Sequence, residues 1–481
     1  MYKKVNSIVV PSREFGINEE CGIFGIIGKQ TEDMAQEIYY GLFSLQHRGQ
    51  ESAGIAVSYD RNKIAYYKNM GLVSEVFGEE ELKLLPKSKV GIGHVRYSTT
   101  GSSNVVNAQP VVFYGRYGRM AIAHNGNIVN ADDIKDKMIE NGHIFQSSID
   151  SEVIAAWINF CGKESIEQGI IEACKIMAGS YALVITAEEK LYAVRDPYGL
   201  KPLIMGEKNG KIVFASESCA LDAIDAVVVR DVLPGEIVCV DIDGHIKSII
   251  FDVKIPKPCI FEYVYLARSD SVIDGQSVYD ARYQCGKQLA KLLKIDADVV
   301  AGVPDSALVS ARGYSEESGI PYVDAISKNR YVGRTFIQPI QSLRESSVKI
   351  KLNAFRSNIK GKRLILIDDS IVRGTTSKKI IKLLRQSGAT EVHMVVCSPM
   401  VKYPCFFGVD MQTKEQLIAN NRTEEDICAI IGADSLHFIP MELLMTTCSA
   451  ETHCSEFCTG CFNGEYSFDI KKFHCEKMGL E

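Results

Sequence analysis

The chain has 481 residues, of which 46% are hydrophobic and 24% charged, and its formal net charge is -6. This length favours two domains of about 200 residues, and the negative charge argues against a nucleic-acid-binding surface, which needs an excess of Lys and Arg. No run reaches the ~20 apolar residues of a membrane span, and residues 1–20 do not read as a secretory signal, so we expect a cytoplasmic enzyme with no nucleic-acid or membrane partner.

Short β-rich runs with helical patterns between them fill the first half of the chain. The predicted strands are residues 21–28, 54–58, 90–94, 120–124, 182–186, 191–195 and 212–215. The predicted helices are residues 33–46 and 151–160. This mixture predicts a layered α+β domain with extensive sheet.

Cys21 begins the first of these strands and is the first candidate for a catalytic residue. A thiol is a suitable nucleophile toward an amide, but it must be activated toward the thiolate. No Cys–His pair is visible in the sequence. A chain-terminal α-amine, with a pKa of about 8, is another possible base, and it would require removal of residues 1–20. A buried strand cysteine without catalytic function is the structural alternative.

Five segments around Cys21 and downstream of it decide between these interpretations. They resemble, in the correct order, the successive motifs of the N-terminal-nucleophile glutamine amidotransferases: 21–25 (CGIFG), 46–50 (QHRGQ), 93–99 (GHVRYST), 124–127 (HNGN) and 150–152 (DSE). The resemblance implies an αββα glutaminase domain with Cys21 as its nucleophile.

The same resemblance implies roles for four further residues. Arg96 would bind the α-carboxylate of glutamine as a planar fork, and Asp150 its α-ammonium group. The side chain of Asn125 and the backbone N–H of Gly126 would form an oxyanion hole, while Cys21 carries a γ-glutamyl thioester. The family scheme uses the α-amine as base, so three histidines within the motifs are expected to be structural: His47, His94 and His124.

After residues 254–258 (KIPKP), which resemble a linker, strands alternate with helices. The predicted strands are residues 298–303, 322–326, 364–367 and 392–397. The predicted helices are residues 276–294, 308–318 and 376–386. Compact apolar strands of this kind predict an open α/β domain with a parallel sheet.

The strongest single motif is residues 364–376 (LILIDDSIVRGTT), a buried strand that ends in Asp368 and Asp369 before a helix opens. The N–H groups at the helix start suit a phosphate, Gly374 allows close approach, and Thr375 and Thr376 add hydroxyl donors. The two carboxylates suit ribose hydroxyls and a hydrated Mg²⁺ ion. An N-cap aspartate in a charged loop is the alternative, and it explains one carboxylate well but both poorly.

This motif closely resembles the phosphoribosyl pyrophosphate site of type I phosphoribosyltransferases. The resemblance implies that Asp368 and Asp369 hold the ribose and that residues 373–376, from Arg373 to Thr376, surround the 5-phosphate. Ser306, after another predicted strand, would lie near the Mg²⁺ ion and the pyrophosphate. A basic loop would close over the pyrophosphate leaving group, although by itself it reads equally well as a solvated loop. The cations of this loop are Lys328, Arg330 and Arg334.

Together the two halves resemble the glutamine phosphoribosylpyrophosphate amidotransferase family, from about Asn18 to Cys461. The resemblance implies that ammonia from glutamine passes through an internal tunnel and displaces pyrophosphate at C1 of the sugar, the first step of purine biosynthesis. It also implies a homotetramer with purine nucleotides (AMP, GMP, ADP) as feedback inhibitors. The expected parts are a propeptide (1–20), a glutamine amidotransferase domain (21–253), a phosphoribosyltransferase domain (254–445) and a cysteine-bearing tail (446–481).

Two rival functions remain in view at this point. One is another glutamine amidotransferase, such as a glucosamine-phosphate or asparagine synthetase, but neither uses a phosphoribosyl donor. The other is a regulatory paralogue that binds purine nucleotides without turnover, which the intact set of site residues argues against.

Fifteen cysteines are many for a reducing compartment, where disulfides are unlikely. Cys458 and Cys461 form a C-x-x-C pair that suits one metal centre. Cys259 and Cys405 lie in segments that resemble those of the iron–sulfur branch of the family, which also carries a propeptide, so we expect these four residues to hold a structural [4Fe-4S] cluster. Zinc is the rival metal, and an ordinary disordered arm is the rival for residues 1–20. Three cysteines compete as ligands: Cys448, Cys454 and Cys475.

Overall fold

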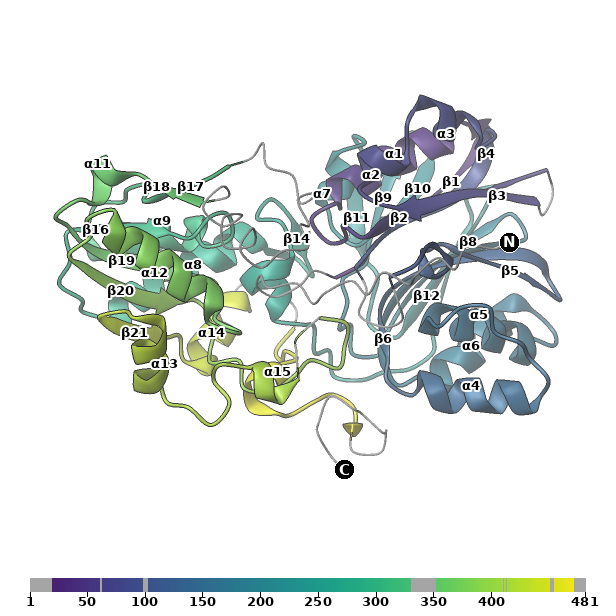
Figure 1. Cartoon of the computed structure of the whole chain (residues 1–481). Coiled ribbons are helices and arrows are strands. Elements are labelled where there is room, and N and C mark those ends of the chain that lie inside the picture. The colour runs from purple at the N-terminus through teal and green to yellow at the C-terminus, as the bar shows by residue number, and fades with distance from the viewer. Residues whose placement is uncertain are drawn as a thin grey trace, which may run out of the picture.

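Two stacked antiparallel sheets form the N-terminal half of the chain in the computed structural model (Figure 1). The structure describes residues 20–60, 63–97, 103–329, 352–409, 411, 413–449 and 454–470. The first sheet has the order β11 (Val227–Asp231), β9 (Ile204–Lys208), β10 (Lys211–Ala215), β1 (Gly22–Glu32), β4 (Ser88–Arg96), β2 (Ser52–Tyr59) and β3 (Lys63–Met70). The second has the order β13 (Ile246–Ile250), β12 (Glu236–Asp241), β8 (Lys190–Arg195), β7 (Gly179–Ala187), β6 (Gly118–Ile128) and β5 (Val111–Gly115).

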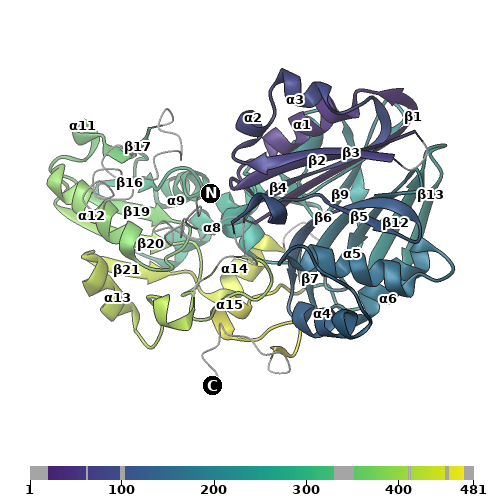
Figure 2. The same ribbon diagram turned by 45° about the vertical axis from the view of Figure 1, so that its right-hand side comes forward.

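Helices cover the outer face of each sheet, which completes an αββα sandwich (Figures 1 and 2). Beside the first sheet lie α1 (Met34–Ser44), α2 (Val73–Val76), α3 (Glu79–Lys83) and α7 (Cys219–Asp222). Beside the second lie α4 (Ala131–Glu140), α5 (Asp150–Cys161) and α6 (Ile166–Ile176), and the single turn η1 (Val105–Asn107) precedes β5.

The alternation of side chains along β1 shows how the layers are held together. Ile23 and Ile27 point into the core between the two sheets, whereas Phe24 and Ile26 pack on the other side among residues of α1. Both faces of the strand are therefore buried, which its nearly continuous apolar sequence favours. At the start of α1, the Asp33 side chain accepts a hydrogen bond from the backbone N–H of Gln36 at 3.3 Å, as an N-cap does.

A four-stranded parallel sheet forms the centre of the C-terminal half, in the order β16 (Val299–Gly302), β19 (Arg363–Asp368), β20 (Glu391–Val396) and β21 (Ser435–Phe438). Its main helices are α8 (Val278–Leu292), α9 (Leu308–Ser318), α12 (Thr375–Gln386), α13 (Glu424–Ile431) and α14 (Met441–Cys448). The smaller elements are η2 (Glu262–Leu266), β14 (Val272–Ile273), β15 (Gln276–Ser277), β17 (Ile326–Lys328), β18 (Leu352–Ala354), α11 (Arg356–Ile359), η3 (Lys414–Gln416) and α15 (Gly460–Asn463).

The two faces of β19 are covered by different helices. Leu364 and Leu366 pack in the core that contains α12 and α13, and Ile365 and Ile367 pack in the core that contains α8, α9 and α14. β19 is therefore a central, fully covered strand. Its C-terminal end lies at the carboxyl edge of the sheet, where ligands bind in open α/β folds.

The expected fold class is confirmed, but one predicted strand is wrong. Residues 322–326 do not join the parallel sheet as a strand; Tyr322 makes an isolated bridge to Val300, and β17 pairs antiparallel with β18. The fourth parallel strand is β21, whose side chains alternate between buried and half-buried because it lies at the sheet edge. An alternating edge strand lacks the continuous apolar run that marks the central ones.

Within the described residues, no helix combines the length and apolar character that crossing a membrane requires. The expected domain boundaries stay predictions, and the one between residues 445 and 446 falls inside α14.

Candidate active sites

The acidic pair lies at the carboxyl edge of the parallel sheet. Asp368 is the last residue of β19 and is buried, and Asp369 follows it half-buried. Ser306 follows the neighbouring strand β16, and its hydroxyl donates to Oδ2 of Asp369. The Ser370 hydroxyl donates to Oδ1 of Asp369 at 2.7 Å. The structure thus brings three of the residues predicted for the sugar and Mg²⁺ site to one edge of the sheet.

Ionisation of the acidic pair is unfavourable because both carboxyls are removed from water and adjacent to one another. Burial, and after it the neighbouring Asp369, raises the pKa of Asp368 well above its usual range. Burial also raises the pKa of Asp369, against hydrogen bonds from Ser306 and Ser370 and the charge of Arg282. Two adjacent carboxyls of this kind suit a divalent ion, whose charge would compensate both.

The residues predicted to surround the 5-phosphate lie at the start of α12. Gly374 is the N-cap, with φ of 74°, and a Cβ there would lie 2.2 Å from Cδ1 of Ile418. No other residue type fits without displacing Ile418, and the helix start beyond it presents the N–H groups of Thr375 and Thr376. This geometry suits the 5-phosphate predicted for these residues.

A cavity of about 530 Å³ is lined by Pro304 and Asp305, which directly precede Ser306, the residue that donates to Asp369. Lys328 lines it, and its Nζ lies 2.6 Å from Oδ2 of Asp305. Two of the three predicted loop cations, Arg330 and Arg334, lie outside the described residues.

Cys21 precedes β1 in the first sheet and is 7% exposed. Its Sγ donates to the backbone carbonyl of Tyr97 at 3.6 Å. Burial raises the pKa of the thiol to about 11, although Arg96 acts to lower it. The thiol is therefore protonated near neutrality and needs a base before it can act as a nucleophile.

Asn125 and Gly126 lie in β6 of the facing sheet. Both polar atoms of the Asn125 side chain are buried and lack a hydrogen-bond partner among the described residues, as expected for groups that await a ligand. Gly126 has φ of 144°, and a Cβ there would meet the carbonyl oxygen of Ser180 at 2.1 Å. Glycine is therefore required at this position.

The two residues predicted to bind the amino-acid end of glutamine are both buried, and both influence the Cys21 thiol. Arg96 ends β4 and forms an ion pair with Glu51, Nη1 to Oε1 at 3.0 Å. Asp150 begins α5, and its Oδ2 accepts from the Ile128 N–H at 3.0 Å. Burial acts to raise the pKa of Asp150, but the nearby His124 and the backbone hydrogen bonds outweigh it and hold the pKa below its usual range.

The three histidines of the motifs have structural contacts. His47 Nε2 lies 2.7 Å from Oε1 of Glu217. His94 Nε2 lies 3.0 Å from the carbonyl oxygen of His124, and burial lowers the pKa of His94 to about 3. His124 Nδ1 lies 3.3 Å from Oγ of Ser151. That none of the three histidines is the base stays a prediction.

The four cysteines predicted as cluster ligands come together from three parts of the chain. Cys259 and Cys458 form a parallel β-bridge, and the Cys458 N–H donates to the Pro258 carbonyl at 2.9 Å. The N–H of Tyr403 donates to the Cys461 carbonyl at 3.0 Å, which ties the segment of Cys405 to the C-x-x-C pair. Burial raises the pKa of Cys458 to about 12, and the adjacent Cys405 adds to this shift.

The competing cysteines are placed differently. Cys448 is buried in a small cavity lined by Cys285 and Leu444, and Cys454 is half-buried, while Cys475 lies outside the described residues. Among the described residues, one group of three ligand types approaches within 4.8 Å, namely Asp241, Asp243 and His245, so no three of the cysteine sulfurs converge this closely.

The fold and the two sites define a two-domain enzyme in which a glutamine amidotransferase half precedes a phosphoribosyltransferase half. Sequence profiles agree with this class: that of the glutamine amidotransferase domain matches residues 94–223, and that of the phosphoribosyl transferase domain matches residues 278–399.

Comparison with curated relatives then gives the family. The amidophosphoribosyltransferase of Methanocaldococcus jannaschii is 47% identical over 94% of this chain and 98% of its own length. That of Bacillus subtilis is 46% identical, with 95% of each chain covered. The solved glutamine phosphoribosylpyrophosphate amidotransferase of B. subtilis, complexed with ADP and GMP, superposes with a TM-score of 0.87 and 45% identity over 94% of this chain and 98% of its own. The chain belongs to the amidophosphoribosyltransferase family.

Proposed function

We propose that the protein hydrolyses glutamine at Cys21 and transfers the ammonia to C1 of phosphoribosyl pyrophosphate, which yields 5-phosphoribosylamine, glutamate and pyrophosphate. The observation that carries this proposal is the presence, in one chain, of two features. One is a buried thiol together with a buried Asn125 amide that has no hydrogen-bond partner among the described residues. The other is an acidic pair ahead of a phosphate-sized helix start. The reaction is the first step of purine biosynthesis.

At the glutamine site, removal of residues 1–20 would place an α-amine on Cys21 itself, within reach of its own thiol proton. Arg96 and Asp150 would bind the two charged groups of the amino acid, and Asn125 with the Gly126 N–H would stabilise the tetrahedral oxyanion. Water then hydrolyses the γ-glutamyl thioester after ammonia has left.

At the sugar site, the side chains of Asp368 and Asp369 would orient the ribose, and the start of α12 would hold its 5-phosphate. Ser306 and the acidic pair would hold Mg²⁺, which would neutralise charge on the pyrophosphate. Lys328, together with Arg330 and Arg334, would stabilise the departing charge and exclude water. Ammonia then attacks C1 with inversion, as the pyrophosphate leaves on the opposite side.

The experiment that tests this function measures pyrophosphate release from the purified protein with phosphoribosyl pyrophosphate and Mg²⁺. Glutamine and concentrated ammonia are supplied in separate reactions, and both are expected to support turnover. Absence of pyrophosphate release with either nitrogen source would overturn the assignment.

We further propose a structural [4Fe-4S] cluster on Cys259, Cys405, Cys458 and Cys461. Four thiolates at about 2.3 Å from one zinc ion would lie roughly 3.8 Å from one another. Among the described residues, no three of the cysteine sulfurs all lie within 4.8 Å of one another, as three ligands of one zinc ion would. The wider arrangement supports a larger centre, and the cluster would tie the C-terminal tail to the interdomain linker.

Anaerobically purified protein is expected to be brown and to contain about four iron atoms per chain. Replacing Cys458 with Ser should lower the iron content and bleach the visible absorption, whereas Cys448→Ser, at a buried thiol away from the group, should leave both unchanged. A colourless protein that contains one zinc ion per chain would reject the cluster.

Residues 1–20 are proposed to be a propeptide, and purine nucleotides to be feedback inhibitors of a homotetramer. The cocrystallised ADP and GMP of the B. subtilis relative support the inhibitor proposal. Intact-mass measurement of the native protein tests the first and last of these proposals, and a decrease in turnover on addition of AMP, GMP or ADP tests the second.

A further inference from the structure

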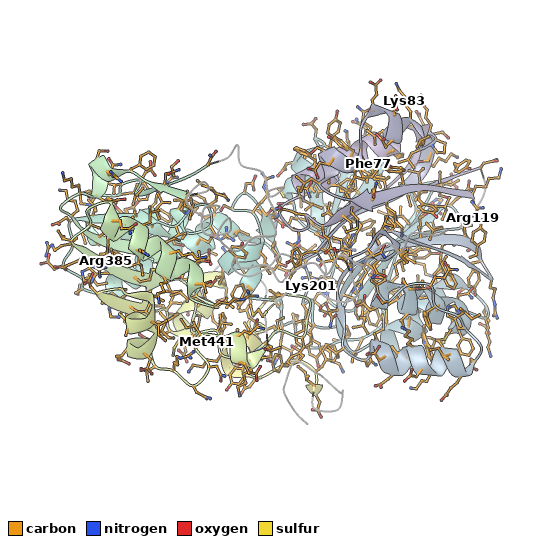
Figure 3. All side chains as sticks on the ribbon, in the orientation of Figure 1. Phe77, Lys83, Arg119, Lys201, Arg385 and Met441 are labelled. Carbon is orange, nitrogen blue, oxygen red and sulfur yellow. The ribbon has the colours of Figure 1, made fainter. Side chains whose placement is uncertain are left out.

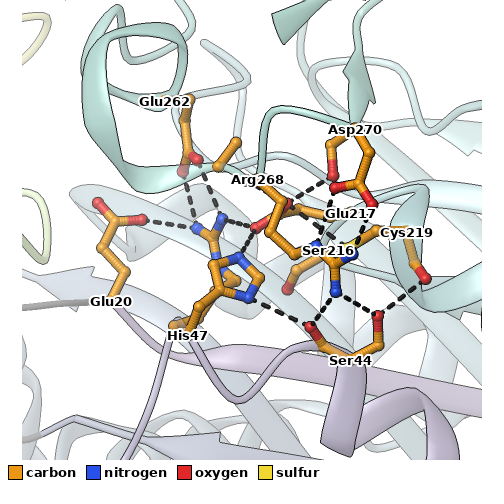
Figure 4. Close-up of polar contacts among 12 residues, drawn as sticks. Glu20, Ser44, His47, Ser216, Glu217, Cys219, Glu262, Arg268 and Asp270 are labelled. Atoms are coloured by element: carbon orange, nitrogen blue, oxygen red, sulfur yellow. Dashed lines mark hydrogen bonds and ion pairs between the residues drawn. The ribbon is translucent and has the colours of Figure 1, made fainter. Parts of the chain in front are cut away.

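A network of buried charges surrounds Arg48, in the loop after α1. Figure 4 labels the three carboxylate partners of Arg48, which are Glu20, Glu217 and Glu262. Its guanidinium pairs with three carboxylates: Nη1 with Glu217 at 2.6 Å, and Nη2 with Glu262 at 2.8 Å and with Glu20 at 3.0 Å. The side chains of all four residues are at most 2% exposed. A buried carboxylate is costly unless it is paired and hydrogen-bonded. The ion pairs of Glu20 therefore determine where its side chain lies.

Arg48 holds both residues that flank the Glu20–Cys21 peptide bond. Nη2 donates to the Glu20 carboxylate, and Nε of the same guanidinium donates to the backbone carbonyl of Cys21 at 3.0 Å. Because the guanidinium is planar and rigid, these two contacts fix the residues on the two sides of the bond relative to one another.

Lys201 holds the other oxygen of the same carboxylate. Its Nζ donates to Oε1 of Glu20, while Arg48 donates to Oε2. Burial acts to lower the pKa of Lys201, but the Glu20 carboxylate outweighs it, so the side chain remains an ammonium ion. Lys201 lies where the two halves of the molecule meet (Figure 3). Glu20 is thus held at both carboxylate oxygens by cations from separate parts of the glutaminase half.

We infer that Arg48 and Lys201 form a clamp for Glu20 that positions the Glu20–Cys21 bond for hydrolysis, and that both are positioning residues for release of the mature N-terminus. This inference rests on the proposed propeptide, and it names the residues of the folded chain that present the bond. An arm held only by backbone contacts would not place a glutamate side chain in the interior.

The step that the clamp serves is the hydrolysis of one peptide bond by water. The C–N bond between Glu20 and Cys21 breaks, the hydroxyl of the water adds to the Glu20 carbonyl carbon, and its proton passes to the nitrogen of Cys21. The products are a carboxylic acid at residue 20 and the α-amine of Cys21. No oxidant or other reactant is required.

The test compares the rate at which full-length chains lose residues 1–20, followed by intact-mass spectrometry after a short pulse of expression. Glu20→Gln keeps the size of the side chain but removes the charge that both cations bind. We expect processing to slow by about tenfold or more, the scale of effect that misplacing a reacting group produces. Glu20→Asp, which keeps the charge, should be slowed less than Glu20→Gln.

Because residue 20 is absent from the mature chain, every Glu20 variant yields the same mature protein. Folding of the product and its specific activity per processed chain are therefore internal controls, and both should equal wild type. Glu19→Gln removes one charge from the adjacent residue and should be processed at the wild-type rate. Equal slowing by Glu19→Gln and Glu20→Gln would show that the total charge of the segment matters and would overturn the clamp.

A double-mutant cycle tests whether Lys201 acts through Glu20. Lys201→Gln is expected to slow processing, and combining it with Glu20→Gln should add little, because the contact is already lost. Additive slowing would reject the clamp. Wild-type chains that retain residues 1–20 would instead reject the propeptide itself, whereas processed wild type with equally fast Glu20→Gln would reject the clamp alone.

Discussion

At the scale of single residues, burial of Asp368 and Asp369 side by side changes both their acidity and their contribution to stability. Both carboxyls have a pKa raised by burial, and Asp368 also by its neighbour. A carboxyl with a raised pKa in the folded chain binds protons that the unfolded chain has released, so this pair reduces the free energy of unfolding as the pH rises. The fold keeps a destabilising pair, which is typical of a binding site.

Replacing both aspartates with asparagine is therefore expected to separate activity from stability. Turnover with glutamine and with ammonia should fall by about a hundredfold or more, because the ribose and Mg²⁺ lose their charged ligands. The melting temperature without ligand should stay at or above that of wild type, with the larger gain at pH 8 than at pH 6. Steady-state assays and thermal melts at both pH values measure this, and unchanged ammonia-dependent turnover would contradict the sugar site.

Single residues differ in how well the sequence alone predicts them. Cys21 and the acidic pair lie within contiguous motifs, so their chemistry can be predicted from the neighbouring residues in the sequence. Glu20 and Lys201 are separated by 181 positions, and Arg48 and Glu262 by 214, so only the fold reveals these pairs. Burial of the charges is equally invisible in a sequence, since Lys and Glu mostly lie at the surface.

Among the elements, the segment of residues 405–408 connects the two halves through hydrogen bonds to its backbone. The Asn127 side chain donates to the Phe406 carbonyl at 3.0 Å, and the Ser180 hydroxyl donates to the Phe407 carbonyl at 2.7 Å. Asn127 and Ser180 flank the predicted oxyanion-hole residue Gly126 in β6 and in the paired strand β7. A segment that carries a proposed cluster ligand therefore supports the backbone of the glutamine site.

Gly408→Ala is expected to disturb this contact. A Cβ at Gly408 would lie 3.2 Å from the carbonyl carbon of Gly126 and 3.3 Å from Cε of Lys201, and the φ of 100° is unfavourable for alanine. Glutamine-dependent turnover should fall several-fold while ammonia-dependent turnover is retained, and unfolding should cost about 1 kcal/mol less.

Gly432→Ala is the matched control for Gly408→Ala. Gly432 also has a positive φ, 80°, but nothing lies within 4 Å of the added Cβ. It should lose a similar amount of stability to backbone strain without a change in the ratio of the two activities. An equal loss of glutamine-dependent turnover in both variants would show that segment 405–408 has no specific effect on the glutamine site.

The elements also show what local patterns predict. Central strands such as β19 are continuous apolar runs, and helices such as α9 begin and end where the periodicity does. The edge strand β21 alternates, and the pairing of β17 with β18 depends on residues 24 positions apart or more. Edges and small sheets are set by tertiary contacts, which a single sequence does not display.

On the scale of the whole molecule, the thiol and the acidic pair lie in separate halves: Cys21 precedes β1 of the sandwich, and Asp368 ends β19 of the parallel sheet. Buried ion pairs span the two halves, among them Arg195 with Asp274 at 2.7 Å. Free ammonia is largely protonated at neutral pH and is then no nucleophile. If the two halves are held in a fixed arrangement, ammonia released at one site can reach the other before it is protonated in water.

Cys21→Ala separates the two half-reactions while keeping this arrangement. The variant lacks the nucleophile, so glutamine hydrolysis and glutamine-dependent pyrophosphate release should both fall below detection. The sugar site is built from other residues, and ammonia at high concentration and alkaline pH should support turnover within about threefold of wild type. Pyrophosphate release with each nitrogen source measures the two rates in parallel.

Cys174→Ala, a change at another buried thiol of the same half, controls for loss of volume and should keep both activities. Loss of the ammonia-dependent rate in Cys21→Ala with a normal melting temperature would contradict separate sites, because the thiol would then be needed for chemistry at the sugar.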